Sequence, residues 1–227
     1  MNKRITTFVE DLASVSLPNV FNPYADFCPD FDMQDAKTIR KQNLLKAINS
    51  AIRQEATSLW IAQDLGYRGG RRTGLALTDE AHLVEHGQML GQHPFLKATR
   101  GPVVAERTAE VVWRALRSIN QPVLLWNVFP LHPHLPAQPM SNRCHTRAER
   151  EIGLGFLKEL LDLLEPKLVI AIGSQASAAL RHLGVECFLA RHPSYGGQSD
   201  FFRAISASYD CKILAKRASD ETSLFES

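Results

Sequence analysis

The stretch from Ser58 to Glu80, SLWIAQDLGYRGGRRTGLALTDE, decides how the chain folds. It opens on the apolar run 59–62 (LWIA), which is typical of a strand buried in a parallel sheet. The polar pair Gln63 and Asp64 follows where this strand is expected to end, and open α/β sheets bind ligands outside the carboxyl ends of their strands. The loop after it can approach an anionic ligand by backbone and by charge; it holds glycines at 66, 69, 70 and 74 and the arginines Arg68, Arg71 and Arg72.

Strands and helices alternate along the rest of the chain. Apolar runs predict three more strands, over 123–126, 168–172 and 185–189. Helical spacing and capping signals predict helices over 1–17, over 36–54 with Asp35 as cap, over 81–90, from Pro102 onward, after a Thr146–Glu149 capping box, over 174–183 and over 201–209. This alternation predicts an α/β fold, a three-layer α/β/α sandwich around a mostly parallel central sheet of about four strands.

The composition suits an ordinary soluble protein. With 227 residues, 44% of them hydrophobic and 22% charged, we expect one domain over 1–227, on which residues 1–35 pack and whose last part, about 217–227, is frayed. No apolar run approaches the ~18 residues that cross a bilayer, and no signal-peptide core follows the first residues. We therefore expect a cytoplasmic protein without membrane contact. We also expect a monomer. The net charge of +2 leaves any nucleic-acid contact to local clusters.

Cysteine and histidine spacing gives no sign of a metal site. The four cysteines form no CxxC pair, and the eight histidines form no HExxH motif. We therefore expect reduced thiols, no metal and no cofactor.

Polar groups follow three of the predicted strands: the pair Gln63–Asp64, then Asn127, then His192. Parallel strands bring their carboxyl ends to one rim, so these groups are expected to meet there. Each also has a purely structural explanation. Asp64 could cap the turn after its strand, Asn127 could begin an Asx turn, and His192 could be a loop residue bonded to backbone.

The order and spacing of these motifs resemble those of the uracil-DNA glycosylase superfamily. One branch of that family carries GQDPYH followed by GLxFS, and the chain carries AQDLGY over 62–67 followed by GLALT over 74–78. A second family motif, HPS, matches 192–194, and the family's pyrimidine-reading asparagine follows a strand as Asn127 does. The resemblance spans about 58–205 and looks closest to bacterial glycosylase-like branches.

The resemblance implies a monofunctional DNA glycosylase acting on DNA that contains a damaged or modified pyrimidine. It would flip a uracil-like or 5-modified pyrimidine and hydrolyse its N-glycosidic bond, leaving an abasic site. Asp64 would orient water and stabilise positive charge on the sugar, and His192 would stabilise negative charge on the base. Gln63 and Asn127 would hydrogen-bond the base. The residues expected to hold DNA are Arg68, Arg71, Arg72, Ser194, Gly196 and Gly197, with Tyr195 or Gln198 filling the gap left by the flipped base. No lysine lies in the motifs, so strand cleavage through a Schiff base is not expected.

Two departures from the family motif concern the base pocket. Gly66 stands where the family's tyrosine blocks 5-substituents, which predicts an open side, and Leu77 replaces a stacking phenylalanine. Tyr67 or Phe129 could supply part of that stacking. We expect weak discrimination against 5-substituted pyrimidines, and a dedicated substrate such as a hypermodified cytosine of phage DNA is one possibility.

Two other functions stay open from the sequence. The fold could recognise modified DNA without turnover, as the departures at Ala62, Leu65 and Leu77 allow. It could also hydrolyse a free nucleotide, with the glycine–arginine loop as an anion cradle. The chain lacks the P-loop GxxxxGK[ST] and Rossmann GxGxxG signatures, which counts against the free nucleotide.

Overall fold

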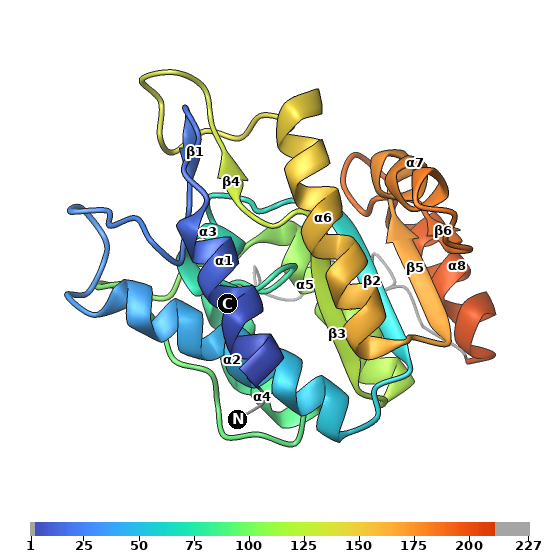
Figure 1. The fold of residues 1–227 in the computed structure, drawn as a ribbon. Helices are drawn as coiled ribbons and strands as arrows, with labels where there is room; N and C mark the ends of the chain where they lie inside the picture. Colours follow the sequence, from blue (N-terminus) through green and yellow to red (C-terminus); the bar gives the residue numbers. More distant parts are fainter. Residues whose placement is uncertain (1–2, 212–227) are drawn as a thin grey trace, which may run out of the picture.

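A four-stranded parallel sheet forms the centre of the protein in the computed structural model, which describes residues 3–211 (Figure 1). The strands are rich in Val, Ile, Leu and Trp, as expected where helices cover both faces of a sheet. The spatial order is β3-β2-β5-β6, and the strands are β2 (Ser58–Asp64), β3 (Val123–Phe129), β5 (Leu168–Ile172) and β6 (Phe188–Ala190). The predicted mostly parallel sheet of about four strands is confirmed.

The register aligns the carboxyl ends of β2 and β3. Ala62 lies opposite Asn127, and Asp64 lies opposite Phe129. Both strands run further than predicted, because their backbone pairing continues through the polar residues. Asn127 therefore lies within β3, whereas the sequence placed it after the strand's end.

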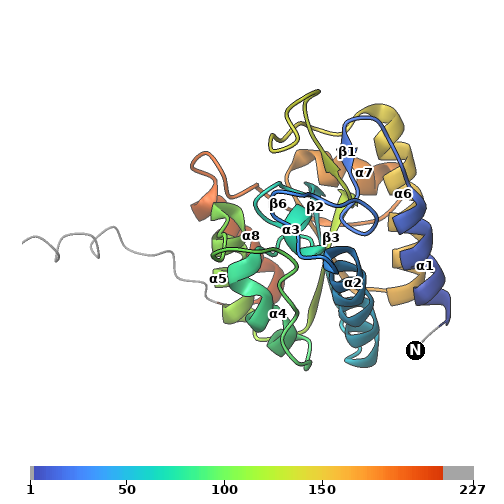
Figure 2. The same ribbon diagram turned by 90° about the vertical axis from the view of Figure 1, so that its left-hand side faces the viewer.

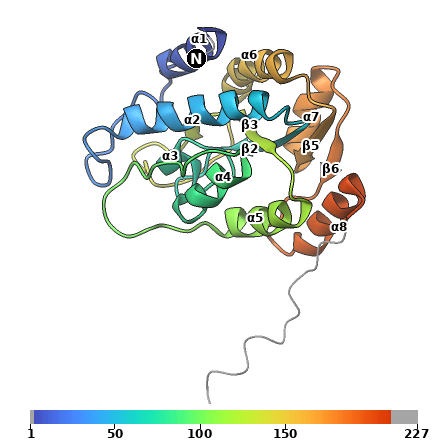
Figure 3. The same ribbon diagram turned by 90° about the horizontal axis from the view of Figure 1, so that it is seen from below.

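Helices cover both faces of the sheet (Figure 3). One apolar core lies between the sheet and the first layer of helices, and it contains the rings of Phe8 and Trp126, whose centroids are 5.7 Å apart. The other core joins the rings of Trp60 and Phe201 at 6.1 Å. The first layer holds α1 (Lys3–Ser14), α2 (Ala36–Arg53), α6 (Arg147–Leu164) and α7 (Ser174–His182), and the second holds α5 (Arg107–Ile119) and α8 (Gln198–Tyr209). This arrangement is the predicted three-layer α/β/α sandwich.

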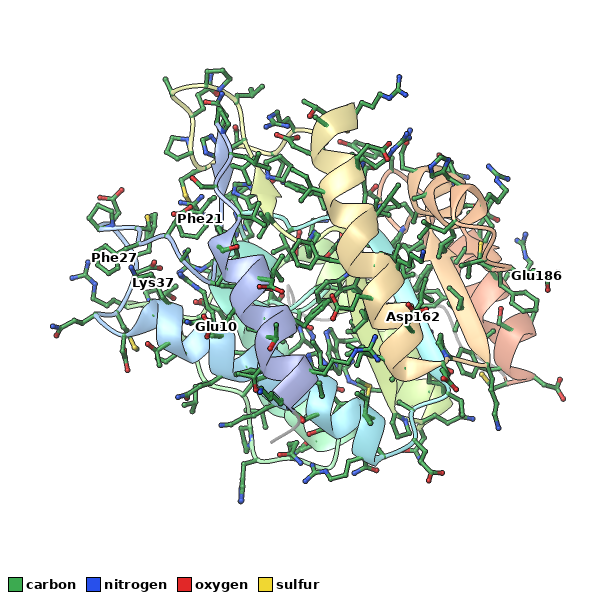
Figure 4. The ribbon with its side chains drawn as sticks, in the orientation of Figure 1. Glu10, Phe21, Phe27, Lys37, Asp162 and Glu186 are labelled. Carbon is green, nitrogen blue, oxygen red and sulfur yellow. The ribbon has the colours of Figure 1, made fainter. Side chains whose placement is uncertain are left out.

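The N-terminal segment packs on the first helical layer. Glu10 of α1, labelled in Figure 4, forms an ion pair with Lys41 of α2 at 3.0 Å. Two short strands that the sequence did not predict, β1 (Val20–Phe21) and β4 (His132–Pro133), pair antiparallel beyond the sheet (Figures 1 and 2). The segment expected to fray, about 217–227, lies outside the described residues. Within residues 3–211 no helix combines the length and apolar character that crossing a membrane requires.

Capping chemistry sets several helix boundaries. Thr146 and Glu149 form the predicted capping box at the start of α6, whereas Asp35 makes no side-chain bond to the first turn of α2. The short helices α3 (Gly70–Thr73), η1 (Glu80–His82) and α4 (Leu83–Met89) connect β2 to the segment before α5.

Helix α5 begins at Arg107, and the prediction of a start at Pro102 is wrong. The backbone of Glu106 is extended, with φ −124° and ψ 130°. Its N–H donates to the Asp79 carboxylate at 2.5 Å, which holds this residue out of the helix.

Buried charges tie the glycine–arginine loop into the protein interior. Arg72 lies 3.2 Å from Glu80, whose side chain is fully buried. Arg71 lies over the ring of Phe21, 3.7 Å from its centroid, and 3.2 Å from His132. Charged groups leave water only when such partners replace their hydration, so these contacts fix the loop in place.

Replacing Glu80 should destabilise the protein strongly, because Arg72 would be left buried without its counter-ion. We expect Glu80→Ala to lower the free energy of unfolding by about 3–5 kcal/mol in urea titrations. Glu85→Ala is the matched control, since Glu85 pairs with Arg117 at the surface and its loss should cost about 1 kcal/mol or less. Equal effects of the two substitutions would contradict the anchoring role of Glu80.

Candidate functional site

A cleft of about 1190 Å³ opens at the carboxyl ends of β2, β5 and β6. It lies where the chain order of the sheet reverses, since β3 flanks β2 on one side and β5 on the other. Ligands of open α/β sheets bind at such switch points. The walls come from residues 62–66, from Leu77, from Glu106 and Thr108, from 142–144, from 172–175 and from the segment between Leu189 and Ala207.

Asp64, the last residue of β2, faces this cleft and is held by His145. The imidazole Nδ1–H donates to Asp64 Oδ1 at 2.5 Å, and the backbone N–H of His145 donates to Oδ2 at 3.3 Å. Burial raises the pKa of Asp64 above its usual value, while the hydrogen bonds and charge of His145 act to lower it. If Asp64 only capped the following turn, a group of that turn would hydrogen-bond its carboxylate. Among residues 3–211 no such hydrogen bond is present.

The sequence did not single out His145. It stands directly before the capping-box residue Thr146, so the start of α6 delivers it to the rim of the sheet. Its side chain is 6% exposed and that of Asp64 is 12% exposed, so water screens the pair little. The nearest signal in the sequence was the capping box itself, which fixes where α6 begins.

His192 lies after β6 in the same cleft and is held as a neutral donor. Its Nδ1 accepts from the backbone N–H of Ser194 at 3.3 Å and lies 2.8 Å from the Ser194 hydroxyl. Burial lowers the pKa of His192. Because Nδ1 is an acceptor, the proton of the neutral ring sits on Nε2, which is left to donate.

Gln63 and Asn127 occupy different depths. Gln63 lines the cleft beside Asp64. Asn127 is 1% exposed, lies next to the cleft residue Ala62 in the register, and is not itself part of the lining. Its buried amide oxygen lacks a hydrogen-bond partner within residues 3–211. An unpaired buried acceptor costs about 1–3 kcal/mol, which is the kind of cost found at functional sites.

Gly66 and Leu77 both line the cleft, but the side at Gly66 is not open as predicted. A Cβ atom on Gly66 would lie 2.8 Å from Oε1 of Glu106. The space is therefore occupied by a carboxyl group. Leu77 has φ +52°, a left-handed conformation that is costly for a branched residue and is often found at functional sites.

Stacking residues suggested by the sequence fall in two places. Phe129 is fully buried in the first core, with its ring 6.1 Å from that of His145, so it does not reach the cleft. Tyr67 is half-buried, and its backbone N–H donates to Asn142 at 3.0 Å.

The prediction that Arg71 and Arg72 contact DNA phosphate is wrong. They are 4% and 6% exposed, and their guanidinium groups are engaged in the interior contacts described above. Arg68 is exposed, with its Nε donating to the carbonyl of Ala105 at 3.3 Å. Two arginines that the sequence did not single out, Arg191 and Arg203, line the cleft with side chains 59% and 77% exposed.

The loop after His192 has one projecting side chain. Tyr195 is 98% exposed and has φ +50°. The N–H of Gly197 donates to the Ser194 carbonyl at 3.1 Å, so this amide is not available to a phosphate as was expected. Gly196 is exposed, and Gln198 accepts from Arg114 at 3.3 Å.

Metal-binding chemistry has no counterpart in this part of the chain. Within residues 3–211, no three side chains of His, Cys, Asp or Glu gather in a group able to hold a metal ion.

Comparison with solved structures agrees with the fold. The protein is similar in structure to wild-type SMUG2 of Pedobacter heparinus, with a TM-score of 0.62 and 14% sequence identity, over 90% of this chain and 94% of that one. At this identity the likeness shows the fold alone. No curated protein sequence matches.

The family match is more specific. The model of the uracil DNA glycosylase superfamily matches residues 57–208, a span that includes the cleft residues Asp64 and His192 and the hydrogen-bond partner of Asp64, His145. This span is more than half of the chain, and the protein therefore belongs to the uracil DNA glycosylase superfamily.

Proposed function

We propose that the protein is a monofunctional DNA glycosylase that hydrolyses the bond between a flipped pyrimidine and its deoxyribose. One observation carries this proposal: a buried carboxylate, Asp64, and a neutral imidazole donor, His192, face the same cleft. Cleaving a glycosidic bond builds positive charge on the sugar and negative charge on the base, and the two groups are matched to these charges.

The reaction assigned to the cleft needs no group beyond water. The C1′–N1 bond breaks and its electron pair leaves with the base, whose carbonyl oxygen O2 accepts a hydrogen bond from Nε2 of His192. The oxygen of water bonds to C1′, and the proton it loses passes to Asp64 or through it to solvent. The base leaves as an anion and then takes up a proton, so the products are a free pyrimidine and an abasic site.

His145 acts through Asp64 and is a positioning residue. Its two hydrogen bonds fix the carboxylate plane and favour the ionised form against the effect of burial. Asn127, with its unpaired amide oxygen beside Ala62, would read the hydrogen-bonding edge of a base that enters past Ala62. Gln63 and Leu77 would complete the walls around the base.

Exposed cationic and aromatic groups around the cleft would hold DNA. Arg68, Arg191 and Arg203 suit phosphate contact, and they take the role first given to Arg71 and Arg72. Ser194 and the backbone of Gly196, in the loop after His192, would add further phosphate contacts, and Ser194 also hydrogen-bonds His192. Tyr195 projects into solvent and would fill the space left by the flipped nucleotide, with Gln198 at its side.

The monofunctional part of the proposal rests on the absence of an amine nucleophile. Among the described residues that line the cleft there is no lysine to form a Schiff base with the sugar. Water is then the attacking group, and the DNA strand stays intact.

Removing either the carboxylate of Asp64 or the imidazole of His192 should slow excision steeply. We expect Asp64→Asn and His192→Ala each to reduce single-turnover release of the base by about 10²-fold or more. Mass spectrometry of released bases from DNA with uracil, mismatched thymine and bulky cytosine modifications is the measurement, with borohydride trapping expected to give no covalent adduct. Asp162→Asn, on the outer surface of α6 (Figure 4), is the control. Full activity in both cleft variants would refute the mechanism.

The pH dependence should reveal the role of His145. Activity requires ionised Asp64, so the rate rises with pH as this carboxyl group loses its proton. Because the His145 side chain lowers the pKa of Asp64, His145→Ala should raise that pKa and move the acid limb of the single-turnover pH profile to higher pH. His182→Ala, at an exposed position of α7, should leave the profile unchanged. A uniform loss of rate without a shift of the limb would indicate only a structural role.

The projecting aromatic ring should matter most in duplex DNA. Filling the vacated position offsets an unstacking cost of a few kcal/mol, which single-stranded DNA largely avoids. We expect Tyr195→Ala to reduce excision from duplex at least about tenfold more than from single strands. Phe27→Ala removes an exposed ring at the edge away from β6 (Figure 4) and is the control. Equal losses on both substrates would argue against insertion.

A further inference from the structure

The side chain of Glu106 enters the cleft with a free carboxyl group. Glu106 stands at the N-cap position of α5, yet its side chain makes no bond to the helix. Asp79 fixes its backbone N–H instead, and the side chain is free to turn toward the cleft that it lines. Within residues 3–211 the carboxyl group has neither a hydrogen-bond partner nor an ion pair.

Two glycines make room for this carboxyl group. A side chain at Gly66 would meet Oε1 at 2.8 Å from its Cβ, and one at Gly69 would collide with Oε2. The amide nitrogen of Asn142 lies 3.9 Å from the Cβ position at Gly66. The glycine turn after β2 therefore forms a cradle, defined here by Gly66 and Gly69, in which the carboxyl group of Glu106 lies.

The cradle lies on the opposite side of the cleft from His192. The glycine turn follows β2, next to β3 in the sheet, whereas His192 follows β6 at the other edge, with β5 between them. A pyrimidine whose O2 accepts from His192 points the opposite ring position, C5, toward the other wall. Asn127 would take the neighbouring edge of the base, which leaves the C5 substituent to Glu106.

Burial and nearby charges together hold the carboxyl group of Glu106 close to the balance between its protonated and ionised forms. Burial is the largest effect and Asp79 adds to it, while Arg68 opposes them, and the pKa of Glu106 is raised to about 7. Asp79 is itself paired with His82 at 2.6 Å. Near neutral pH Glu106 thus accepts hydrogen bonds in its ionised form and can also donate when protonated.

Resting on the glycosylase function proposed above, we propose that Glu106 is a specificity-determining residue that selects pyrimidines whose C5 substituent carries a hydrogen-bond donor, such as a hydroxyl group. A methyl group at the same position would cover the carboxyl group of Glu106 without giving it a hydrogen-bond partner, and a polar group that loses water without gaining a partner penalises the wrong ligand. The volume of about 1190 Å³ leaves space for such a substituent beside the base.

The test compares 5-hydroxymethyluracil with thymine in otherwise identical mismatched duplexes. Wild type should excise the hydroxymethyl base about tenfold faster or more, and Glu106→Leu, which keeps the bulk without the polar atoms, should reduce that ratio about tenfold. The ratio cancels a general loss of rate. Glu106→Gln should restore part of the preference, and Glu110→Leu, an exposed position in the first turn of α5, should keep the wild-type ratio. An unchanged ratio in Glu106→Leu overturns the inference.

Measuring the excision rates over a series of pH values provides a second test of the role of Glu106. A 5-formyl group only accepts hydrogen bonds, so ionisation of Glu106 should disfavour it. The ratio of hydroxymethyl to formyl excision should rise between pH 6 and 8 in wild type and rise less in Glu106→Gln. The same slope in both proteins would contradict control by this carboxyl group.

Binding separates this inference from the glycosylase proposal. Equilibrium binding of Asp64→Asn, with and without Glu106→Leu, to the hydroxymethyl and thymine duplexes measures selection without chemistry. If no base is released by wild type but binding still favours the hydroxymethyl duplex through Glu106, the glycosylase proposal fails and the selection survives. If uracil is excised but neither rate nor binding shows a preference that depends on Glu106, the glycosylase proposal stands and the selection by Glu106 is overturned.

Discussion

The parallel pairing of β2 with both of its neighbours is the constraint on which the cleft depends. It sets Asp64 at the rim, keeps Asn127 beside Ala62, and leaves β5 and β6 to carry His192 to the same rim. A shift of one residue in β2 would turn every side chain to the other face of the sheet and exchange Asp64 for Gln63. The two apolar cores forbid such a shift, because Trp60 and Ile61 are both fully buried on opposite faces.

Rigid support beneath the cleft comes from groups that do no chemistry. Asp79 accepts hydrogen bonds from the N–H groups of Ala81, His82 and Glu106 and from the imidazole of His82. Together with the Arg72–Glu80 pair, this carboxylate holds the loop after β2 against the start of α5. This wall of the cleft is thus made from backbone that has little freedom to move, which is the condition for electrostatic preorganisation.

The sequence predicted what local patterns encode. Unbroken apolar runs predicted the strands that are covered on both faces, and the Thr146 capping box predicted the start of α6. The order and spacing of the motifs predicted that Asp64 and His192 meet in one cleft. Contacts between distant segments have no such local signal. Asp64 and His145 are 81 positions apart, and Arg71 and Arg72 look like surface residues until Phe21 and Glu80 are placed against them.

The cradle around Glu106 also limits how this protein could change. A side chain at position 66 would meet the end of the flexible Glu106 side chain, which would have to turn away, and removing Glu106 would widen the cleft beside Gly66 and Gly69. Substitutions at positions 66 and 106 are therefore expected to be epistatic, because the space open to a side chain at one position depends on which residue stands at the other.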